Sequence, residues 1–166
     1  MSLPPHKLVV GLIRPQIPQN VGNIARTCVV AAPPLHIAEP IPFALDEARA
    51  RRSGLDYWPR LNLTLHASEE ELLAAAPAGR AWLFDSAGET SLFEADFADG
   101  DWLIFGSETY GLPHQTLALY PGRTLHIPQA AGERCLNLAT SVGIALYQAL
   151  ARTSSAGRHA APGADF

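Results

Sequence analysis

The sequence has few cysteines, no paired histidines and no long apolar run, and each shortage excludes a class of protein. Its two cysteines, Cys28 and Cys135, lack metal-binding or redox spacing, so we expect reduced thiols in a cytoplasmic protein. The six histidines are scattered, which predicts no metal site. No stretch reaches the ~18 consecutive apolar residues that indicate a membrane helix. The first residues also lack the apolar core of a signal peptide.

Charged side chains are scarce as well, and basic ones are outnumbered. Charged residues make up 17% of the chain, below the ~25% typical of soluble domains, which predicts that a second subunit covers part of the surface. Twelve Lys and Arg residues against 16 Asp and Glu residues give a net charge of −4. Non-specific nucleic-acid binders are normally basic, so only recognition of a folded RNA through a local basic patch is compatible with this balance.

Three common sequence motifs are absent. No G-x-G-x-x-G follows the first apolar run, which disfavours a dinucleotide-binding Rossmann domain, and no G-x-x-x-x-G-K-[ST] occurs, which excludes a P-loop. The segment FGSETYGLP at 105–113 is not G-x-S-x-G, so a serine hydrolase loses its main support.

What the sequence does contain is an alternation of apolar runs and helical patterns. This alternation predicts a single α/β domain over residues 1–152, with a mostly parallel sheet and helices on both faces. Residues 153–166 are small and polar with Pro and Gly, which predicts a disordered tail. Strands are expected at 7–15, 35–40, 61–67, 80–85, 101–106 and 123–128, and helices from about Asn20 and at 45–54, 68–77, 113–121 and 136–152. Ser68 followed three residues later by Glu71 is a capping box, which predicts the start of the helix at 68–77.

Three loops contain residues that could bind a ligand or take part in catalysis, and the first is PQNVGNIARTC, at 18–28. Asn20 or Asn23 can cap a helix here, and Gly22 lets the backbone approach a ligand closely. A helix N-terminus favours anions, and Arg26 adds a bidentate fork for phosphate about one turn in. The alternative is an ordinary capped helix whose Arg26 pairs with a nearby carboxylate.

The other two loops also follow predicted strands. In an open α/β sheet ligands bind beyond the carboxyl ends of the strands, where FGSETYGLP lies; the alternative is a tight turn with Glu108 capping the next helix. The third loop leads from Pro128 into a helix that carries Asn137, Thr140 and Ser141 in its first turns. Small residues along that helix would let another backbone approach, although its apolar positions are those of a buried core helix.

Together, in this order and spacing, the three loops resemble the three motifs of the SPOUT, or trefoil-knot, methyltransferases. The motifs are PQNVGNIARTC at 18–28, GSETYGLP at 106–113 and the segment 127–150, and RRSGLDYW at 51–58 matches a further segment of the TrmL/YibK group. The resemblance runs from Lys7 to about Arg152. It implies a C-terminal segment threaded into a knot, and 2′-O-methylation of the tRNA wobble nucleotide, cytidine 34 or a modified uridine 34.

The resemblance also implies a cofactor and an assembly. S-adenosylmethionine would bind bent in a pocket made by the loops of the knot. The protein would be a homodimer through its first and last helices, and each site would combine one subunit's cofactor with the other subunit's first motif. Carried over by position, the cofactor-binding residues are Phe84, Gly106, Glu108, Gly111, Leu112, Ile127, Cys135 and Leu136.

The catalytic residues implied by the resemblance are Arg26 and Asn20. In this family the arginine at the position of Arg26 is often assigned the role of general base, but a guanidinium is a poor proton acceptor. We therefore favour a clamp on the flanking phosphate that stabilises negative charge on the attacking oxygen, with Asn20 holding the ribose or positioning Arg26.

The substrate-binding residues would lie around this centre and on a basic patch. Many relatives carry Arg where Tyr110 stands. Tyr57, Trp58 and Tyr110 are candidates for stacking on an unpaired base of the anticodon stem-loop. The residues expected to contact the tRNA are Asn137, Ser141, Tyr147, Tyr110, Arg49 and Arg52.

Two other functions fit the same residues. One is a SPOUT enzyme that methylates another tRNA position or ribosomal RNA, although such relatives usually carry an extra RNA-binding domain. The other is a flavodoxin-like binding module that holds a small anion between Asn20 and Arg26. Binding of S-adenosylhomocysteine separates the enzyme from the module.

Overall fold

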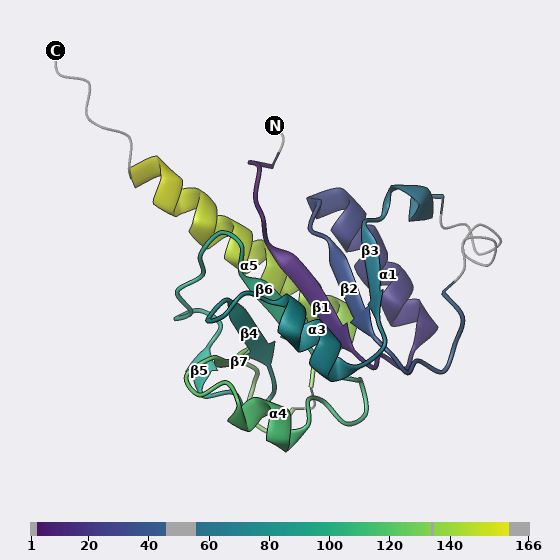
Figure 1. The fold of residues 1–166 in the computed structure, drawn as a ribbon. Coiled ribbons are helices and arrows are strands. Elements are labelled where there is room, and N and C mark those ends of the chain that lie inside the picture. The colour runs from purple at the N-terminus through teal and green to yellow at the C-terminus, as the bar shows by residue number, and fades with distance from the viewer. Residues whose placement is uncertain (1–2, 46–55, 134, 160–166) are drawn as a thin grey trace, which may run out of the picture.

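A computed structural model describes residues 3–45, 56–133 and 135–159 as a sheet of parallel strands covered by helices (Figure 1). The predicted α/β domain with a mostly parallel sheet is confirmed, since all strand pairs in the described residues are parallel, in the order β3-β2-β1-β6-β4-β7-β5. The strands are β1 (Val9–Ile13), β2 (Leu35–Ala38), β3 (Leu63–His66), β4 (Ala81–Phe84), β5 (Thr90–Ser91), β6 (Trp102–Phe105) and β7 (Thr124–His126). The helices are α1 (Pro18–Ala31), α3 (Glu69–Ala75), α4 (His114–Ala118) and α5 (Leu138–His159), with a 3₁₀ turn η1 (Trp58–Arg60).

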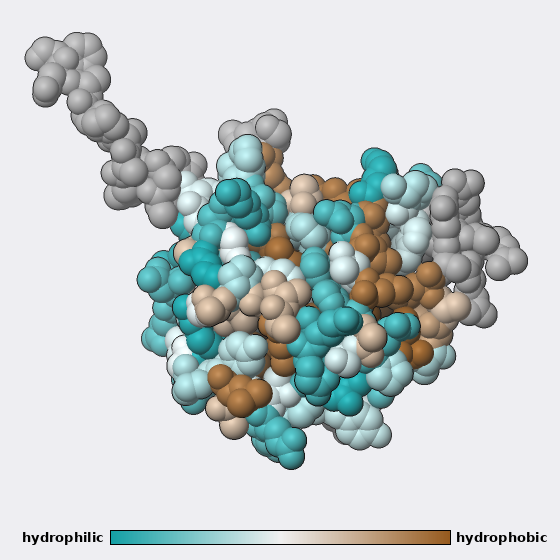
Figure 2. All heavy atoms as spheres, in the orientation of Figure 1, coloured by the Kyte–Doolittle hydropathy of each residue, from teal (hydrophilic) through white to brown (hydrophobic). Residues whose placement is uncertain are grey.

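Helices cover both faces of the sheet, as predicted, because alternate residues of each central strand are apolar on both sides. In β1, Val10 and Leu12 join the core under α1 and α5, whereas Val9 and Ile13 join the core under α3 and α4. On the face shown in Figure 2, apolar surface gathers beside β2 and β3, at the edge of the sheet, where Leu65 is 46% exposed. None of the helices in the described ranges is long and apolar enough to cross a membrane.

The strand order at the other edge of the sheet fits the predicted knot. Strands β4 and β5 both precede β6 in the sequence, yet the later strand β7 lies between them and pairs with each. The crossing is tight, because a Cβ at Gly88 would lie 2.3 Å from the carbonyl carbon of Leu125. Helix α5 then contacts the segment between β5 and β6, where Arg152 donates a hydrogen bond to the carbonyl of Phe93.

Two helix ends differ from the predictions. Neither Asn20 nor Asn23 caps α1; the N-cap is Ile17, without a side-chain cap, and Pro18 occupies the first turn, where its missing N–H costs nothing. Helix α5 extends to His159, seven residues beyond the helix end predicted at 152. A helix already fixed by a buried segment extends at little cost, and Thr153 Oγ1 donates to the Ala149 carbonyl at 2.9 Å.

The other predicted elements include one that is confirmed and one that lies outside the described residues, and one strand was not predicted. The predicted capping of the helix after Ser68 is confirmed, since Ser68 Oγ accepts from the Glu71 N–H at 3.3 Å. Strand β5 was not predicted, because two half-buried polar residues carry no periodicity. The helix predicted at 45–54 falls almost entirely on 46–55, outside the described residues.

Candidate active site

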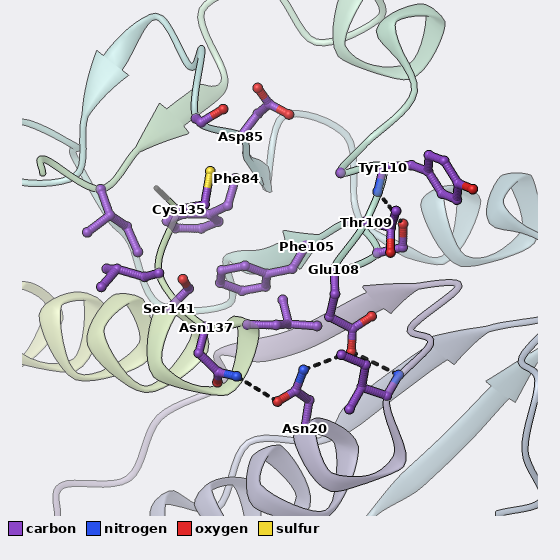
Figure 3. A pocket seen from close by; sticks show the side chains of 18 of the residues that line it. Asn20, Phe84, Asp85, Phe105, Glu108, Thr109, Tyr110, Cys135, Asn137 and Ser141 are labelled. Carbon is purple, nitrogen blue, oxygen red and sulfur yellow. Dashed lines mark hydrogen bonds between the residues drawn. The ribbon is translucent and has the colours of Figure 1, made fainter. Parts of the chain in front are cut away.

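The three motifs meet at one cavity of about 440 Å³, at the carboxyl ends of β4, β6 and β7 (Figure 3). This is where ligands bind in open α/β sheets, and the volume suits a small molecule. The aromatic rings of Phe84 and Phe105, paired across β4 and β6, stack with their centroids 4.4 Å apart and line the cavity. The remaining lining residues are Ile17, Asn20, Asp85, Ser86, Gly106, Ser107, Glu108, Thr109, Tyr110, Gly111, Leu125, Ile127, Gln129, Cys135, Leu136, Asn137, Leu138 and Ser141.

A chain of hydrogen bonds joins the three motifs at the rim of this cavity. The Glu108 carboxylate accepts from the backbone N–H groups of Gln16 and Ile17, at 2.7 and 3.1 Å. Its Oε1 also accepts from the Asn20 side-chain amide at 3.0 Å. Asn20 Oδ1 in turn accepts from Asn137 Nδ2 at 2.8 Å. Glu108 therefore ties its loop to the start of α1 and does not cap the helix that follows it.

Asn137 ends this chain and also caps α5. Its Oδ1 accepts from the backbone N–H groups of Ala139 and Thr140, at 2.9 and 3.3 Å. Asn20 is only 5% exposed, and both ends of its amide are engaged. The orientation of both amides is therefore fixed at the cavity wall, where Figure 3 shows them in line with Glu108.

The wall between β6 and α4 is a turn that only glycine can form. The backbone N–H groups of Ser107 and Gly111 each donate to the other residue's carbonyl, at 3.2 and 2.9 Å. A Cβ at Gly106 would lie 2.1 Å from the Gly111 carbonyl carbon, and Gly111 itself has a φ of +62°. Both glycines are thus required by the backbone, which exposes the peptide groups of this turn to the cavity.

Most of the predicted cofactor residues line the cavity, and one does not. Leu112 is 3% exposed and lies in the core beneath α3 and α4. The resemblance placed Leu112 in the site by its position in the second motif, but its side chain lies in the core. Those that do line the cavity are Phe84, Gly106, Glu108, Gly111, Ile127, Cys135 and Leu136.

The predicted substrate residues are divided between the cavity and other places. Asn137, Ser141 and Tyr110 line the cavity. Tyr147 does not; it is 46% exposed on α5. Arg49 and Arg52 lie outside the described residues.

Arg26 lies away from this cavity, on the exposed side of α1. Its guanidinium carbon is 5.1 Å from the centre of the Tyr57 ring. Tyr57 is 4% exposed, and its hydroxyl donates to the Gly22 carbonyl at 2.6 Å. Burial raises the pKa of Tyr57, while the positive charge of Arg26 opposes that rise. Tyr57 therefore supports Arg26 and is too buried to stack on an RNA base, contrary to the sequence-based expectation.

Asn20 and Arg26, the two predicted catalytic residues, are not in contact within the described residues. Six residues apart on a helix of about 3.6 residues per turn, they point to different faces of α1. The Asn20 amide is held by Glu108 and Asn137. Asn20 consequently cannot position Arg26 within one chain, and a role toward the ribose is the expectation that is left.

Sequence reasoning missed some of the residues that build the site. Tyr57 follows the basic segment in GLDYW, but no local signal shows that its ring supports Arg26. Asp85 and Ser86 line the cavity directly after β4, and their position at a strand end was the available signal. No group of three or more metal-ligating side chains occurs in the described part of the chain.

This fold and site place the chain in a known class of enzymes. A model of the SpoU rRNA Methylase family matches residues 7–147. The chain belongs to this family, whose fold carries the predicted SPOUT knot.

Individual members of the family are similar to this chain over most of its length. The chain is 36% identical over 157 residues to a tRNA (cytidine(34)-2′-O)-methyltransferase of Polaromonas, covering 93% of this chain and 96% of the relative. A solved structure concerned with 2-OH methylation of C/U34 on tRNA is 46% identical, with a TM-score of 0.84 over 92% of this chain and 99% of the other. An AdoMet-bound rRNA methyltransferase from Sinorhizobium meliloti is 25% identical, with a TM-score of 0.73 over 90% of this chain and 57% of the other.

Proposed function

We propose that this protein transfers a methyl group from S-adenosylmethionine to the ribose 2′-hydroxyl of nucleotide 34 in tRNA. The observation that carries the proposal is the convergence of the three motifs on one cavity, joined by the chain from Glu108 through Asn20 to Asn137. The relatives that match nearly the whole chain have this activity, and we place the enzyme in the cytoplasm with its substrate.

The cavity suits the proposed cofactor in its chemistry. The stacked rings of Phe84 and Phe105 offer an apolar surface for the adenine, and the backbone of the turn after Gly106 offers hydrogen-bonding groups for the polar parts. When bound, S-adenosylmethionine supplies an electrophilic methyl group on a sulfonium. The chain's own task is to hold the ribose oxygen in line with that methyl, and positioning of this kind can lower a barrier by ~7–11 kcal/mol.

The polar rim of the cavity would orient the acceptor. Asn20 and Asn137 are fixed by their hydrogen bonds and need no rearrangement when the ribose arrives. Arg26 would clamp the phosphate beside the target nucleotide and stabilise negative charge on the attacking oxygen. Its position over the Tyr57 ring would help to hold the guanidinium for a bidentate contact.

Arg26 lies away from the cavity of its own chain, so it can act on a bound substrate only at the cavity of a second subunit. We therefore propose a homodimer. Helices α1 and α5 lie side by side on one face of the sheet (Figure 1). They expose Val30 at 66%, Ile144 at 37% and Tyr147 at 46%. Val30 lies one turn beyond Arg26 on α1, so an interface over these apolar residues would place Arg26 near the partner's cavity.

The activity is tested by methylating an anticodon stem-loop and mapping the product. Mass spectrometry should find one methyl on the ribose of nucleotide 34, and the bond after it should resist alkali. A methyl on a base, or on a ribose elsewhere, would refute the assignment. Asn20→Ala should lower turnover, and Lys7→Ala serves as the control, because Lys7 is exposed and precedes the amino end of β1, opposite the strand ends that line the cavity.

The shared site is tested by mixing two inactive variants. Arg26→Ala keeps a sound cavity, and Gly106→Ala keeps a sound Arg26 but blocks the cavity wall. If Arg26 acts across the dimer, random exchange makes half the dimers mixed, each with one intact site, so activity returns to about a quarter of the wild-type level. Activity that stays at the level of the separate variants would show that Arg26 acts within its own chain.

A further inference from the structure

The turn after β6 has a second cavity on its other side. This cavity of about 370 Å³ is lined by residues that include Arg14, Gln16 and Pro113. It shares Ser107, Tyr110 and Gly111 with the proposed cofactor cavity, so the two are separated by the thickness of a single turn. Of the residues that could contact an RNA here, only Tyr110 has a role assigned above, as a candidate for stacking on an unpaired base, and Arg14 has none.

Arg14 is held at the wall of this cavity with hydrogen-bond donors to spare. Its Nη2 donates to Glu69 Oε2 at 2.8 Å, and the other oxygen of Glu69 accepts from Thr116. No further hydrogen bond from the Arg14 guanidinium occurs within the described residues, and its side chain is 45% exposed. Arg14 also has a φ of 49°, a left-handed conformation that side-chain-bearing residues adopt mainly where surrounding structure enforces it.

The pairing with Glu69 decides what Arg14 can recognise. The Glu69 carboxylate compensates the positive charge, so the site gains little from a phosphate. The guanidinium N–H groups that are left suit a neutral acceptor, such as a base carbonyl or a ring nitrogen.

Tyr110 supplies a flat surface at the border of the two cavities. Its side chain is 78% exposed, and Figure 3 shows the ring directed away from Phe84 and Phe105. The turn that carries it is fixed, since the Tyr110 N–H donates to Ser107 Oγ at 3.2 Å. An exposed aromatic ring on a rigid turn is a platform on which an unpaired base can stack.

We propose that the second cavity binds the base of the nucleotide next to the one that is methylated. That base stacks on Tyr110, and its edge accepts a hydrogen bond from Arg14. Consecutive nucleotides of an extended strand would then lie on the two sides of one turn, with the target ribose at the cofactor cavity. The inference rests on the proposed function and adds base recognition beside the target nucleotide.

The test is a cycle of protein variants and abasic substrates. The substrates are the anticodon stem-loop and two versions that lack the base on one or the other side of nucleotide 34. Arg14→Gln and Tyr110→Ala should each raise the KM for the intact stem-loop about tenfold, at the lower end of what stacking supplies. Tyr110→Phe should keep the wild-type KM, because the ring is retained. Lys7→Gln, which removes an exposed charge before the amino end of β1, is the control.

The abasic substrates decide the outcome. Loss of the bound base removes both contacts and should raise the wild-type KM at least tenfold, and neither variant should add anything to it. If the variants raise KM equally on intact and abasic RNA, or not at all, the cavity binds no base. If the wild-type enzyme methylates another nucleotide, the proposed function fails, and the same comparison is made with the bases beside that nucleotide.

Discussion

Replacing Glu108 by Gln should loosen the site and the fold together, because one carboxylate accepts three hydrogen bonds. Two come from the backbone N–H groups of Gln16 and Ile17 and one from the Asn20 side chain. A glutamine keeps only one acceptor oxygen and directs an NH₂ group at donors on its other side. The change is isosteric, so its effect reports hydrogen bonding rather than packing.

The magnitude follows from those bonds. A hydrogen bond to a charged acceptor contributes about 1.5–3 kcal/mol, and leaving a donor unsatisfied costs about 1–3 kcal/mol. Glu108 is half-buried, so water would satisfy part of the loss and we expect a net destabilisation of about 2–3 kcal/mol. For a chain of this size that lowers Tm by roughly 4–12 °C. Turnover should also fall, because Asn20 would be held only through Asn137.

Thermal and urea unfolding at one fixed protein concentration measure the stability, since the Tm of the proposed dimer would depend on concentration. Glu89→Gln is the matched control, because within the described residues the Glu89 carboxylate accepts one N–H, from Gly122 at 3.0 Å. It should cost less than about 1 kcal/mol. Equal losses in the two variants, or an unchanged Glu108→Gln protein, would show that the link between the motifs does not stabilise the site.

Three further changes test other contacts. Tyr57→Phe keeps the ring beside Arg26 and should retain turnover at a stability cost of about 1 kcal/mol. Tyr57→Leu removes the ring and should lower kcat in stem-loop methylation. Equal kcat values for the two variants would show that the ring does not support Arg26. Burial and the neighbouring His66 lower the pKa of His36 from 6.5 to about 4. Between these two pH values the unfolded state binds a proton that the folded state does not, so the free energy of unfolding in urea should fall by about 1–2 kcal/mol as the pH drops from 6.5 to 4. His36→Asn should flatten this dependence on pH, and an unaltered slope would contradict the assignment. Gly106→Ala places a Cβ 2.1 Å from the carbonyl carbon across its turn and should abolish S-adenosylhomocysteine binding in calorimetry, so near-wild-type affinity would place the cofactor elsewhere.

Much of the fold could be predicted from local patterns. The continuous apolar runs at β4 and β6 identified strands buried on both faces, and Ser68 with Glu71 identified the start of α3. The order of the three loops identified the family, since each motif is a contiguous segment. Patterns failed where the signal was short or the cause distant, as in the two residues of β5 and the extension of α5 to His159.

The sequence by itself determined which residue types are available at the carboxyl ends of the strands, because strand periodicity and loop composition are local properties. Only the tertiary structure decided how those residues are used. Glu108 is about ninety residues from the backbone groups that it binds, and Asn137 is separated from Asn20 by 117 positions. Leu112 turned into the core beside a cavity-lining glycine, and Arg26 came to lie on Tyr57, outside the cavity of its own chain. Hydrogen bonds and packing between distant segments form only when the sheet brings the strand ends together, and no local pattern encodes that meeting.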